Sequence, residues 1–407
     1  MRKRPTGNMT VRHKGHWTRF IVALFLIAII ATVALLFIKH ANNSDQHVNG
    51  NDKSATDQIA DKPANELPTE DPTLTQAKKI LEGMTIEEKV GQMFIVRVPD
   101  SNATQDVSTY HIGGYIMFGR DFAGKTKDQI IQTINSWQAN AKIPLFIGVD
   151  EEGGIVNRIS TNPNLRAAPF WSPQDLYAEG GFDLIRSDTQ EKTELLHSLG
   201  VNLNFAPVSD VSQNPYDFIY SRSFGQDGVA TAEYVRNVVE VMQEQKMGSV
   251  LKHFPGYGNN TDTHTGVAYD NRPYEIFTSS DFLPFQAGIN AGASLVLVSH
   301  NVVSAIDNQS PASLSPQVHE ILRNDLGFDG VIITDDLVMD GVRSFAGDAE
   351  VAIKAVQAGN DMLCCTNFWE QIPAVINAVS SGQISEERIN ESVLRILRLK
   401  ISLDIIS

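Results

Sequence analysis

The sequence predicts an α/β fold in which the main folded unit is a (β/α)8 barrel of the TIM type. Eight short apolar runs alternate with segments whose apolar residues recur at helical spacing, which indicates a parallel sheet covered by helices. Several runs end directly in a polar residue, as barrel strands do at their catalytic face. Eight units over about 330 residues suit a barrel better than an open doubly wound sheet, which commonly has five or six strands.

The chain opens with a basic segment, residues 1–19, followed by an uncharged apolar run at 20–38. In a helix this run nearly matches a hydrocarbon core of roughly 30 Å, so a transmembrane helix is expected. Six cationic residues precede the run and only Lys39 closely follows it, which favours a cytoplasmic amino terminus and an extracytoplasmic catalytic domain at the cell membrane. A cleaved signal peptide, giving a secreted form, is the alternative, although the run is long for one and no small-x-small site follows Ile38.

Residues 39–73 are predicted to be a disordered acidic linker, because they are rich in Asn, Asp, Ser, Gln and Pro and contain few large aliphatic side chains. Residues 74–407 are then expected to be a single catalytic domain. The formal net charge of −15 disfavours nucleic acid as a partner, since association would begin against repulsion. Cys364 and Cys365 are the only cysteines and are adjacent, so no stabilising disulfide is expected.

Within this domain the residues at 85–88 have the spacing of a capping box and predict a short opening helix. The expected strands are 93–96, 115–118, 145–149, 201–205, 249–251, 295–298, 331–333 and 361–363. Helical patterns include 127–140, 231–245, 316–325 and 350–357, and the apolar face of a last helix lies within 385–407.

A dense group of titratable side chains follows the strand at 249–251. Pro255 and two glycines exclude regular structure there, so Lys252 and His253 are expected at the strand's carboxyl end, where parallel α/β folds carry out their chemistry. Asp262 and His264 are two residues apart and should point the same way in an extended segment. The carboxylate could hold one imidazole nitrogen and leave the other to move protons, although a surface turn is an equal interpretation.

Two further clusters follow predicted strands. Asp335 and Asp336 come after the strand at 331–333, and only one is expected to face a cavity, because successive side chains of extended backbone point oppositely. Asp335, nearer the strand, is the candidate nucleophile, whereas the competing interpretation makes either residue a cap of the next turn.

The second cluster, residues 150–158, contains Asp150, a pair of glycines and Arg158. Asp150 could accept hydrogen bonds from vicinal hydroxyls, or it could form an ion pair with Arg158 that only shapes the loop. Arg222 is another fork-shaped donor in a loop after a strand.

Together these segments resemble glycoside hydrolase family 3, in particular its β-N-acetylglucosaminidase branch. The resemblance runs from about Ile80 to the end and rests on Asp150-x-Glu152-Gly153-Gly154, Arg158, Arg222-Ser223-Phe224, Lys252-His253-Phe254-Pro255-Gly256, Asp262-x-His264 and Thr334-Asp335-Asp336-Leu337. Such an ordered set is far more specific than any one of its motifs.

The resemblance implies hydrolysis of terminal, non-reducing N-acetylglucosamine with retention, through a covalent glycosyl-enzyme and without a metal or organic cofactor. By position, Asp335 resembles the family's nucleophile, His264 its acid/base and Asp262 the partner of that histidine. The residues that match those holding the sugar are Asp150, Arg158, Arg222, Lys252 and His253. With the anchor, this implies peptidoglycan fragments or related N-acetylglucosamine glycans as partners, and it leaves phosphorolysis open as a side activity.

Two other classes of protein stay open at this stage, besides another β-glycosidase of the same family. His253, Asp262 and His264 could gather around Zn²⁺ in a metal-dependent hydrolase, although no H-E-x-x-H spacing is present. The chain could also be a non-catalytic cell-surface sugar-binding protein. A nucleophile and a proton donor together argue against pure binding, which has no need of either.

Overall fold

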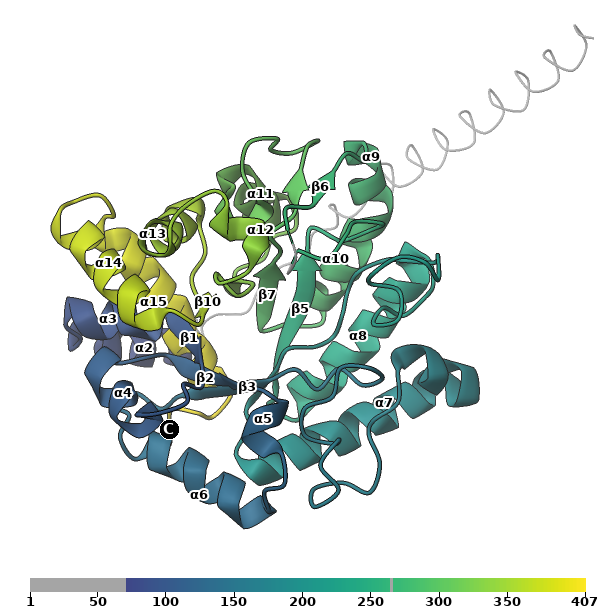
Figure 1. Cartoon of the computed structure of the whole chain (residues 1–407), viewed down its shortest axis with the longest axis horizontal. Coiled ribbons are helices and arrows are strands. Elements are labelled where there is room, and N and C mark those ends of the chain that lie inside the picture. The colour runs from purple at the N-terminus through teal and green to yellow at the C-terminus, as the bar shows by residue number, and fades with distance from the viewer. Residues whose placement is uncertain (1–70, 264–265) are drawn as a thin grey trace, which may run out of the picture. The chain divides into compact units, whose positions relative to one another are not determined.

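The structure, a computed structural model, describes residues 71–263 and 266–407. In this part of the chain a parallel sheet has the strand order β10-β1-β2-β3-β4-β5-β7-β9. Its strands are β1 (Phe94–Arg97), β2 (Gly114–Met117), β3 (Phe146–Val149), β4 (Leu203–Asn204), β5 (Gly248–Phe254), β7 (Leu295–Val298), β9 (Val331–Thr334) and β10 (Leu363–Cys365). An isolated parallel bridge from Ile333 to Met362 joins the two end strands, so the sheet closes into the predicted barrel (Figure 1).

Helices surround this barrel (Figure 1). They are α2 (Pro72–Glu82), α3 (Ile86–Gln92), α4 (Ala103–Tyr110), α5 (Gly119–Phe122), α6 (Lys127–Gln138), α7 (Pro173–Leu199), α8 (Gly228–Glu244), α9 (Tyr274–Ile276), α10 (Phe282–Asn290), α11 (Pro316–Glu320), α12 (Asp340–Arg343), α13 (Asp348–Ala358), α14 (Phe368–Ser380) and α15 (Glu386–Ser402). Short 3-10 and π segments are η1 (Phe277–Asp281), η2 (Ala312–Leu314) and η3 (Ile321–Asp325), and a separate parallel pair consists of β6 (Tyr269–Asp270) and β8 (Val302–Val303).

Each predicted strand overlaps an observed barrel strand, because strands buried on both faces leave near-continuous apolar runs in the sequence. The strand predicted at 249–251 is longer than expected: β5 continues to Phe254 and includes Lys252 and His253, which are only 2% and 5% exposed. The long helix α7 was not predicted. Its pattern is interrupted at Gly181, whose φ of 62° and ψ of −153° are not helical.

The domain begins slightly earlier than predicted. Helix α2 starts at Pro72, because the carboxylate of Asp71 accepts the backbone N–H of Thr73 at 3.0 Å, so the expected boundary between 73 and 74 falls inside this helix. The predicted segments 1–19 and 20–38, and the linker up to residue 70, lie outside the described residues. None of the helices in the described part of the chain combines the length and the apolar character that a membrane crossing requires.

The predicted capping box before α3 is present, with the backbone N–H of Glu88 donating to Thr85 Oγ1 at 3.4 Å and that of Thr85 donating to Glu88 Oε2 at 3.1 Å. Both cysteines are free and buried in β10.

A buried carboxylate forms hydrogen bonds at the junction of β9 and β10, where the barrel closes. Asp361 lies just before β10 and is 0% exposed. One oxygen accepts the N–H of Ile332 in β9 at 3.0 Å and a hydrogen bond from Arg323, and the other accepts from Ser392 at 2.9 Å and from Arg395 at 3.3 Å. This side chain therefore joins β9, η3 and α15 at the end of the barrel opposite the catalytic face.

Replacement of Asp361 by Asn is expected to lower the free energy of unfolding by about 3 kcal/mol, since it removes the fully buried charge that pairs with the partly buried guanidinium groups of Arg323, Arg388 and Arg395. Asp329→Asn is the matched control, because Asp329 also pairs with Arg395 but has a side chain that is 72% exposed. It should cost less than about 1 kcal/mol. Urea unfolding measures both, and equal losses would contradict the role of the buried carboxylate.

Candidate active site

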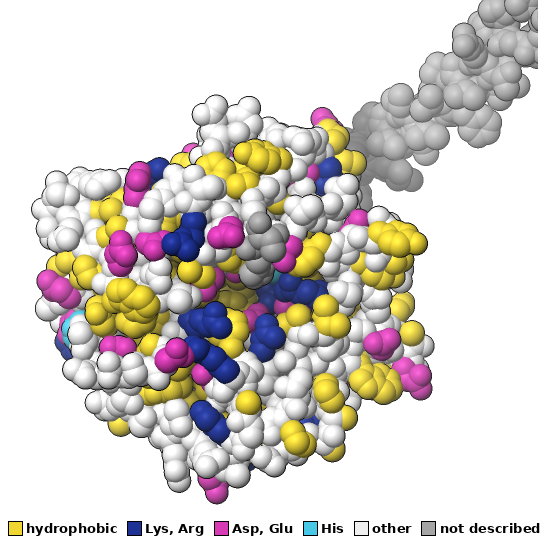
Figure 2. All heavy atoms as spheres, viewed as in Figure 1, with side chains coloured by type: hydrophobic (Ala, Val, Ile, Leu, Met, Phe, Trp, Pro, Cys, Tyr) yellow, Lys and Arg dark blue, Asp and Glu magenta, His cyan; other side chains and the backbone are white. Residues whose placement is uncertain are grey.

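A cavity of about 220 Å³ opens at the carboxyl ends of the barrel strands. Its polar lining comes from Arg97, Asp150, Glu152, Arg158, Arg222, Lys252, His253, Tyr257, Asp335 and Asp336. Figure 2 shows this hollow near the centre of the face, with Lys and Arg side chains gathered around it. The cavity thus brings together the predicted residues Asp150, Arg158, Arg222, Lys252, His253 and Asp335.

An ionic network forms one wall of the cavity. The Lys252 ammonium lies 2.6 Å from Asp150 Oδ1 and 2.6 Å from Glu152 Oε1. Arg222 contacts Glu152 with two nitrogens, Nε at 3.0 Å and Nη2 at 2.7 Å, which is the bidentate geometry that arginine favours. The alternative pairing of Asp150 with Arg158 is therefore wrong: the partner of Asp150 is Lys252.

The network keeps its members charged. Burial alone would raise the pKa of Glu152, but Arg222 and Lys252 hold that pKa well below its usual range. Burial alone would lower the pKa of Lys252, but the Asp150 and Glu152 carboxylates raise it above its ordinary value. The wall therefore presents fixed charges throughout the neutral pH range, which suits recognition of sugar hydroxyls by charge-assisted hydrogen bonds.

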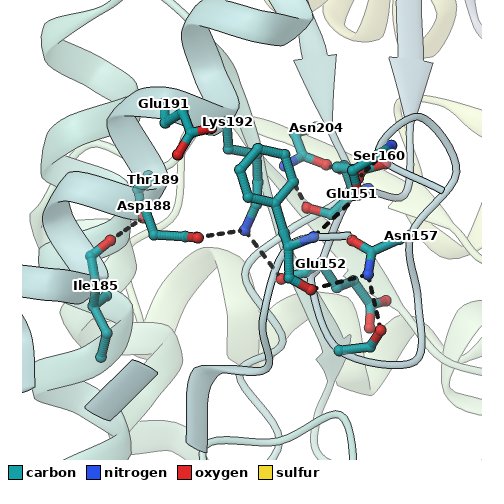
Figure 3. A network of polar contacts seen from close by, with 12 residues as sticks. Glu151, Glu152, Asn157, Ser160, Ile185, Asp188, Thr189, Glu191, Lys192 and Asn204 are labelled. Carbon is teal, nitrogen blue, oxygen red and sulfur yellow. Dashed lines mark hydrogen bonds and ion pairs between the residues drawn. The ribbon is translucent and has the colours of Figure 1, made fainter. Parts of the chain in front are cut away.

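Glu152 is central to the ionic network, although the sequence placed it in a motif without assigning it a role. Its backbone carbonyl also accepts a hydrogen bond from Lys192 at 3.3 Å, and Lys192 pairs with Asp188 one turn earlier in α7 at 3.0 Å (Figure 3). The neighbouring Glu151 points elsewhere and accepts the backbone N–H groups of Arg158 and Ile159 at 2.8 Å and 2.7 Å. These contacts fix the loop between β3 and α7.

His253 is oriented by a carboxylate that sequence reasoning missed. Asp210 Oδ2 lies 2.7 Å from His253 Nδ1, and Asp210 also accepts the backbone N–H groups of His253 and Tyr257, at 3.1 Å and 2.7 Å. Arg222 Nη2 is 3.3 Å from His253 Nε2. A guanidinium can only donate, so we assign the proton to Nδ1 and the acceptor lone pair to Nε2. In this tautomer the one lone pair of His253 Nε2 accepts the hydrogen bond from Arg222, so the histidine positions the guanidinium at the cavity.

Two further arginines, Arg97 and Arg158, line the cavity beside the Phe118 ring. The Arg97 guanidinium is 4.3 Å from the centroid of the Phe118 ring, and that of Arg158 is 5.8 Å from it. Arg97 was not predicted as a site residue. Its position directly after an apolar run, as the last residue of β1, is the sequence signal that could have found it.

Asp335 and Asp336 both line the cavity, contrary to the expectation that only one would. The carboxylate of Asp336 is engaged, because its oxygens accept the N–H of Val338 at 3.1 Å and the hydroxyl of Thr366 at 2.9 Å. Burial raises the pKa of Asp336 above its ordinary value, against these hydrogen bonds. The interpretation as a turn cap thus applies to Asp336, and Asp335 is the better candidate for a nucleophile.

The segment that carries Asp262 and His264 is only partly described. His264 lies outside the described residues. Thr263, between the two, is fastened to both sides of the cavity: its hydroxyl contacts that of Tyr257, and its carbonyl accepts the N–H of Gly341 in α12 at 3.0 Å. Asp262 is therefore adjacent in the chain to a residue that is held by two hydrogen bonds, and it lies close to Tyr257 in the cavity wall.

No group of three or more His, Cys, Asp or Glu side chains in residues 71–263 and 266–407 is arranged to hold a metal ion. His253, one of the three residues considered for zinc, contacts Asp210 and Arg222 instead.

Comparisons with known proteins agree with this geometry. The family model described as the glycosyl hydrolase family 3 N terminal domain matches residues 85–399. A β-hexosaminidase of Xanthomonas campestris pv. campestris is 35% identical over 256 residues, which is 62% of this chain and 76% of that protein. The β-hexosaminidase LpqI of Mycobacterium tuberculosis is 29% identical over 326 residues, 77% of this chain and 82% of that protein.

Among solved structures, a glycoside hydrolase family 3 β-N-acetylglucosaminidase from Paenibacillus sp. str. FPU-7 superposes with a TM-score of 0.74 at 32% sequence identity. The match covers 79% of this chain but only 63% of the Paenibacillus chain.

Glu152→Gln is expected to weaken the binding of N-acetylglucosamine at least tenfold, because it leaves Lys252 and Arg222 as adjacent cations without the carboxylate between them. Titration calorimetry with the free sugar measures the change. Glu191→Gln is the control: Glu191 lies on nearby α7 and pairs with Arg166, but its side chain is 58% exposed. Unchanged affinity in Glu152→Gln would contradict the importance of the ionic network.

Proposed function

The chain belongs to glycosyl hydrolase family 3, and from this premise we propose that it is a retaining exo-β-N-acetylglucosaminidase that releases terminal, non-reducing N-acetylglucosamine. The observation that carries the proposal is one cavity that holds Asp335 at the end of β9 together with the ionic network of Asp150, Lys252 and Arg222. A nucleophile beside a rigid set of hydroxyl-binding groups is what glycoside cleavage requires. The names of the relatives, β-hexosaminidase and β-N-acetylglucosaminidase, support N-acetylglucosamine as the sugar.

In the first step a carboxylate oxygen of Asp335 bonds to the anomeric carbon while the bond from that carbon to the glycosidic oxygen breaks. The leaving oxygen takes a proton, which we assign to His264, with Asp262 holding its other ring nitrogen. The Asp335 carboxylate also stabilises the positive charge that develops on the sugar ring. Of this pair we assign the role of nucleophile to Asp335, which lines the cavity directly after β9 and whose Oδ1 accepts the backbone N–H of Asp336 at 2.8 Å.

In the second step water attacks the anomeric carbon of the glycosyl-enzyme and displaces Asp335. The same imidazole, now neutral, accepts the proton of that water, so two displacements retain the configuration of the sugar. The anchoring of Thr263 to Tyr257 and Gly341 supports this role, because it ties the neighbouring segment to the cavity wall and to the helix that follows Asp335.

The sugar is held by groups whose charges are already paired. Asp150 accepts hydrogen bonds from hydroxyls, and Lys252 and Arg222 donate to hydroxyl oxygens, while His253 Nε2 holds the Arg222 guanidinium in place. Asp210 keeps this histidine in the accepting tautomer. Since the network is assembled before the substrate arrives, little reorganisation is needed on binding.

The physiological substrates that we propose are peptidoglycan fragments outside the cytoplasmic membrane. The support is the apolar run at 20–38 with its cationic flank, which favours an anchored, extracytoplasmic domain tethered by residues 39–70. The acidity of the chain is consistent with a small neutral leaving group or glycan rather than a polyanion.

The purified protein is expected to hydrolyse 4-nitrophenyl N-acetyl-β-glucosaminide and to leave the corresponding β-glucoside nearly untouched. Asp335→Asn should lower kcat by roughly 10⁴-fold or more, since the covalent step is lost, whereas affinity for N-acetylglucosamine should persist. Release of nitrophenol and calorimetry provide the two readouts. Faster cleavage of the glucoside would contradict the choice of N-acetylglucosamine as the sugar. Full activity of Asp335→Asn would contradict the assignment of Asp335 as the nucleophile.

The full-length chain is expected to sediment with membranes, to resist an alkaline carbonate wash and to be extracted by detergent, because an apolar helix remains in the bilayer under those conditions. Deletion of residues 20–38 should move it to the soluble fraction. A protein found in the medium with a new amino terminus after Ile38 would instead support the cleaved signal peptide.

A further inference from the structure

The large apolar side chains that are exposed in the described part of the chain gather at the catalytic end of the barrel. Each lies in a segment that follows the carboxyl end of a barrel strand, in a loop, in β6, in α9 or near the start of a longer helix there: Ile155, Trp171, Tyr177, Tyr216, Phe218, Val229, Tyr269, Ile276 and Trp369. Exposed apolar surface that concentrates around a cavity, rather than being scattered, marks an interaction surface.

Two of these side chains, Tyr216 and Phe218, form what we call the aromatic platform, on the loop between β4 and α8. Tyr216 is 94% exposed and Phe218 is 37% exposed. The ring centroid of Phe218 lies 5.8 Å from that of Tyr257, which lines the cavity and meets the His253 ring at 5.1 Å. Phe218 therefore connects the wall of the sugar-binding cavity to the exposed loop that carries Tyr216.

The platform is rigid although its rings are exposed. The carboxylate of Asp217, between the two aromatic residues, accepts hydrogen bonds from Ser212 at 2.8 Å and from Asn214 at 2.8 Å. Ile219, next in the chain, is fully buried in a small apolar cluster with Val208 and Tyr257. A ligand that stacks on these rings would therefore lose little free energy to ordering of the loop.

This position decides what the platform can bind, on the basis of the function proposed above. An exo-acting enzyme encloses only the terminal sugar, so the rest of the glycan must leave through the mouth of the cavity. The C–H groups of a β-linked pyranose give it apolar faces that stack on aromatic rings. We propose that Tyr216 and Phe218 bind the sugars beyond the cleaved bond, and that the preferred substrate is a β-1,4-linked, N-acetylglucosamine-containing chain rather than a disaccharide.

The strand order supplies a matched control across the mouth. Strands β4 and β10 lie on opposite sides of the eight-stranded barrel, and the helices that follow them, α8 and α14, are on opposite sides of Figure 1. Trp369, near the start of α14, is 52% exposed like a platform residue, but its ring contacts Phe368, which does not line the cavity. It is an exposed aromatic residue of the same face without the connection to the sugar site.

The test compares kcat/KM for β-1,4-linked N-acetylglucosamine oligomers of increasing length. From the dimer to the tetramer we expect a rise of about tenfold in the wild-type protein, since the second and later sugars beyond the cleaved bond can stack only in longer chains. In Tyr216→Ala and in Phe218→Ala the ratio of kcat/KM for the tetramer to kcat/KM for the dimer should fall toward one. The main cause should be a higher KM for the tetramer. In Trp369→Ala the ratio should stay as in the wild type. Tyr216 is too exposed for its truncation to disturb folding.

The outcomes separate this inference from the proposed function. Hydrolysis of 4-nitrophenyl N-acetyl-β-glucosaminide without any gain in rate along the oligomer series would overturn the platform and leave the enzyme standing. No hydrolysis of either kind would overturn the function itself. A gain that survives both platform variants but disappears in Trp369→Ala would place the chain across the opposite rim. Loss of binding to phospholipid vesicles in Tyr216→Ala, with an unchanged ratio, would make the platform a lipid contact and overturn the proposal.

Discussion

The buried ammonium of Lys252, held between Asp150 and Glu152, is the contact on which the arrangement of the site depends. It joins the ends of β3 and β5 across β4, and Arg222 extends it to the next loop through Glu152. Burying any one of these charges alone would be costly, and together they compensate each other. The network therefore forms only when β3, β4 and β5 lie side by side, and it gives the sugar a fixed pattern of donors and acceptors.

Around this contact the structure uses further carboxylates for support. Asp210 holds His253 in one tautomer, and Asp188 holds Lys192, which in turn holds the backbone of Glu152. At the end of β9 two neighbouring carboxylates have different environments. Asp336 accepts hydrogen bonds from Val338 and Thr366, while Asp335 beside it accepts the backbone N–H of Asp336. Identical chemical groups can thus differ in their chemistry because their hydrogen-bond partners differ.

The same barrel separates stability from chemistry. The Asp361 cluster closes the seam between β9 and β10 at one end, and the sugar site occupies the other end. Exposed aromatic side chains are found at the catalytic end, where a long substrate would emerge. Changes in the loops at that end can therefore alter which aglycone is accepted without affecting how the barrel closes.

The sequence alone determined the eight strands and the placement of Asp150, Lys252 and Asp335 at strand ends, because buried strands leave apolar runs and the following residue must face the catalytic edge. It left open whether Asp150 pairs with Arg158, and which of two neighbouring aspartates caps a turn. It also gave no sign of Asp210. Those questions were decided by the tertiary structure, because the answers are contacts between residues far apart in the chain. Asp150 and Lys252 meet only when parallel strands come together, and no local pattern of residues records that distance.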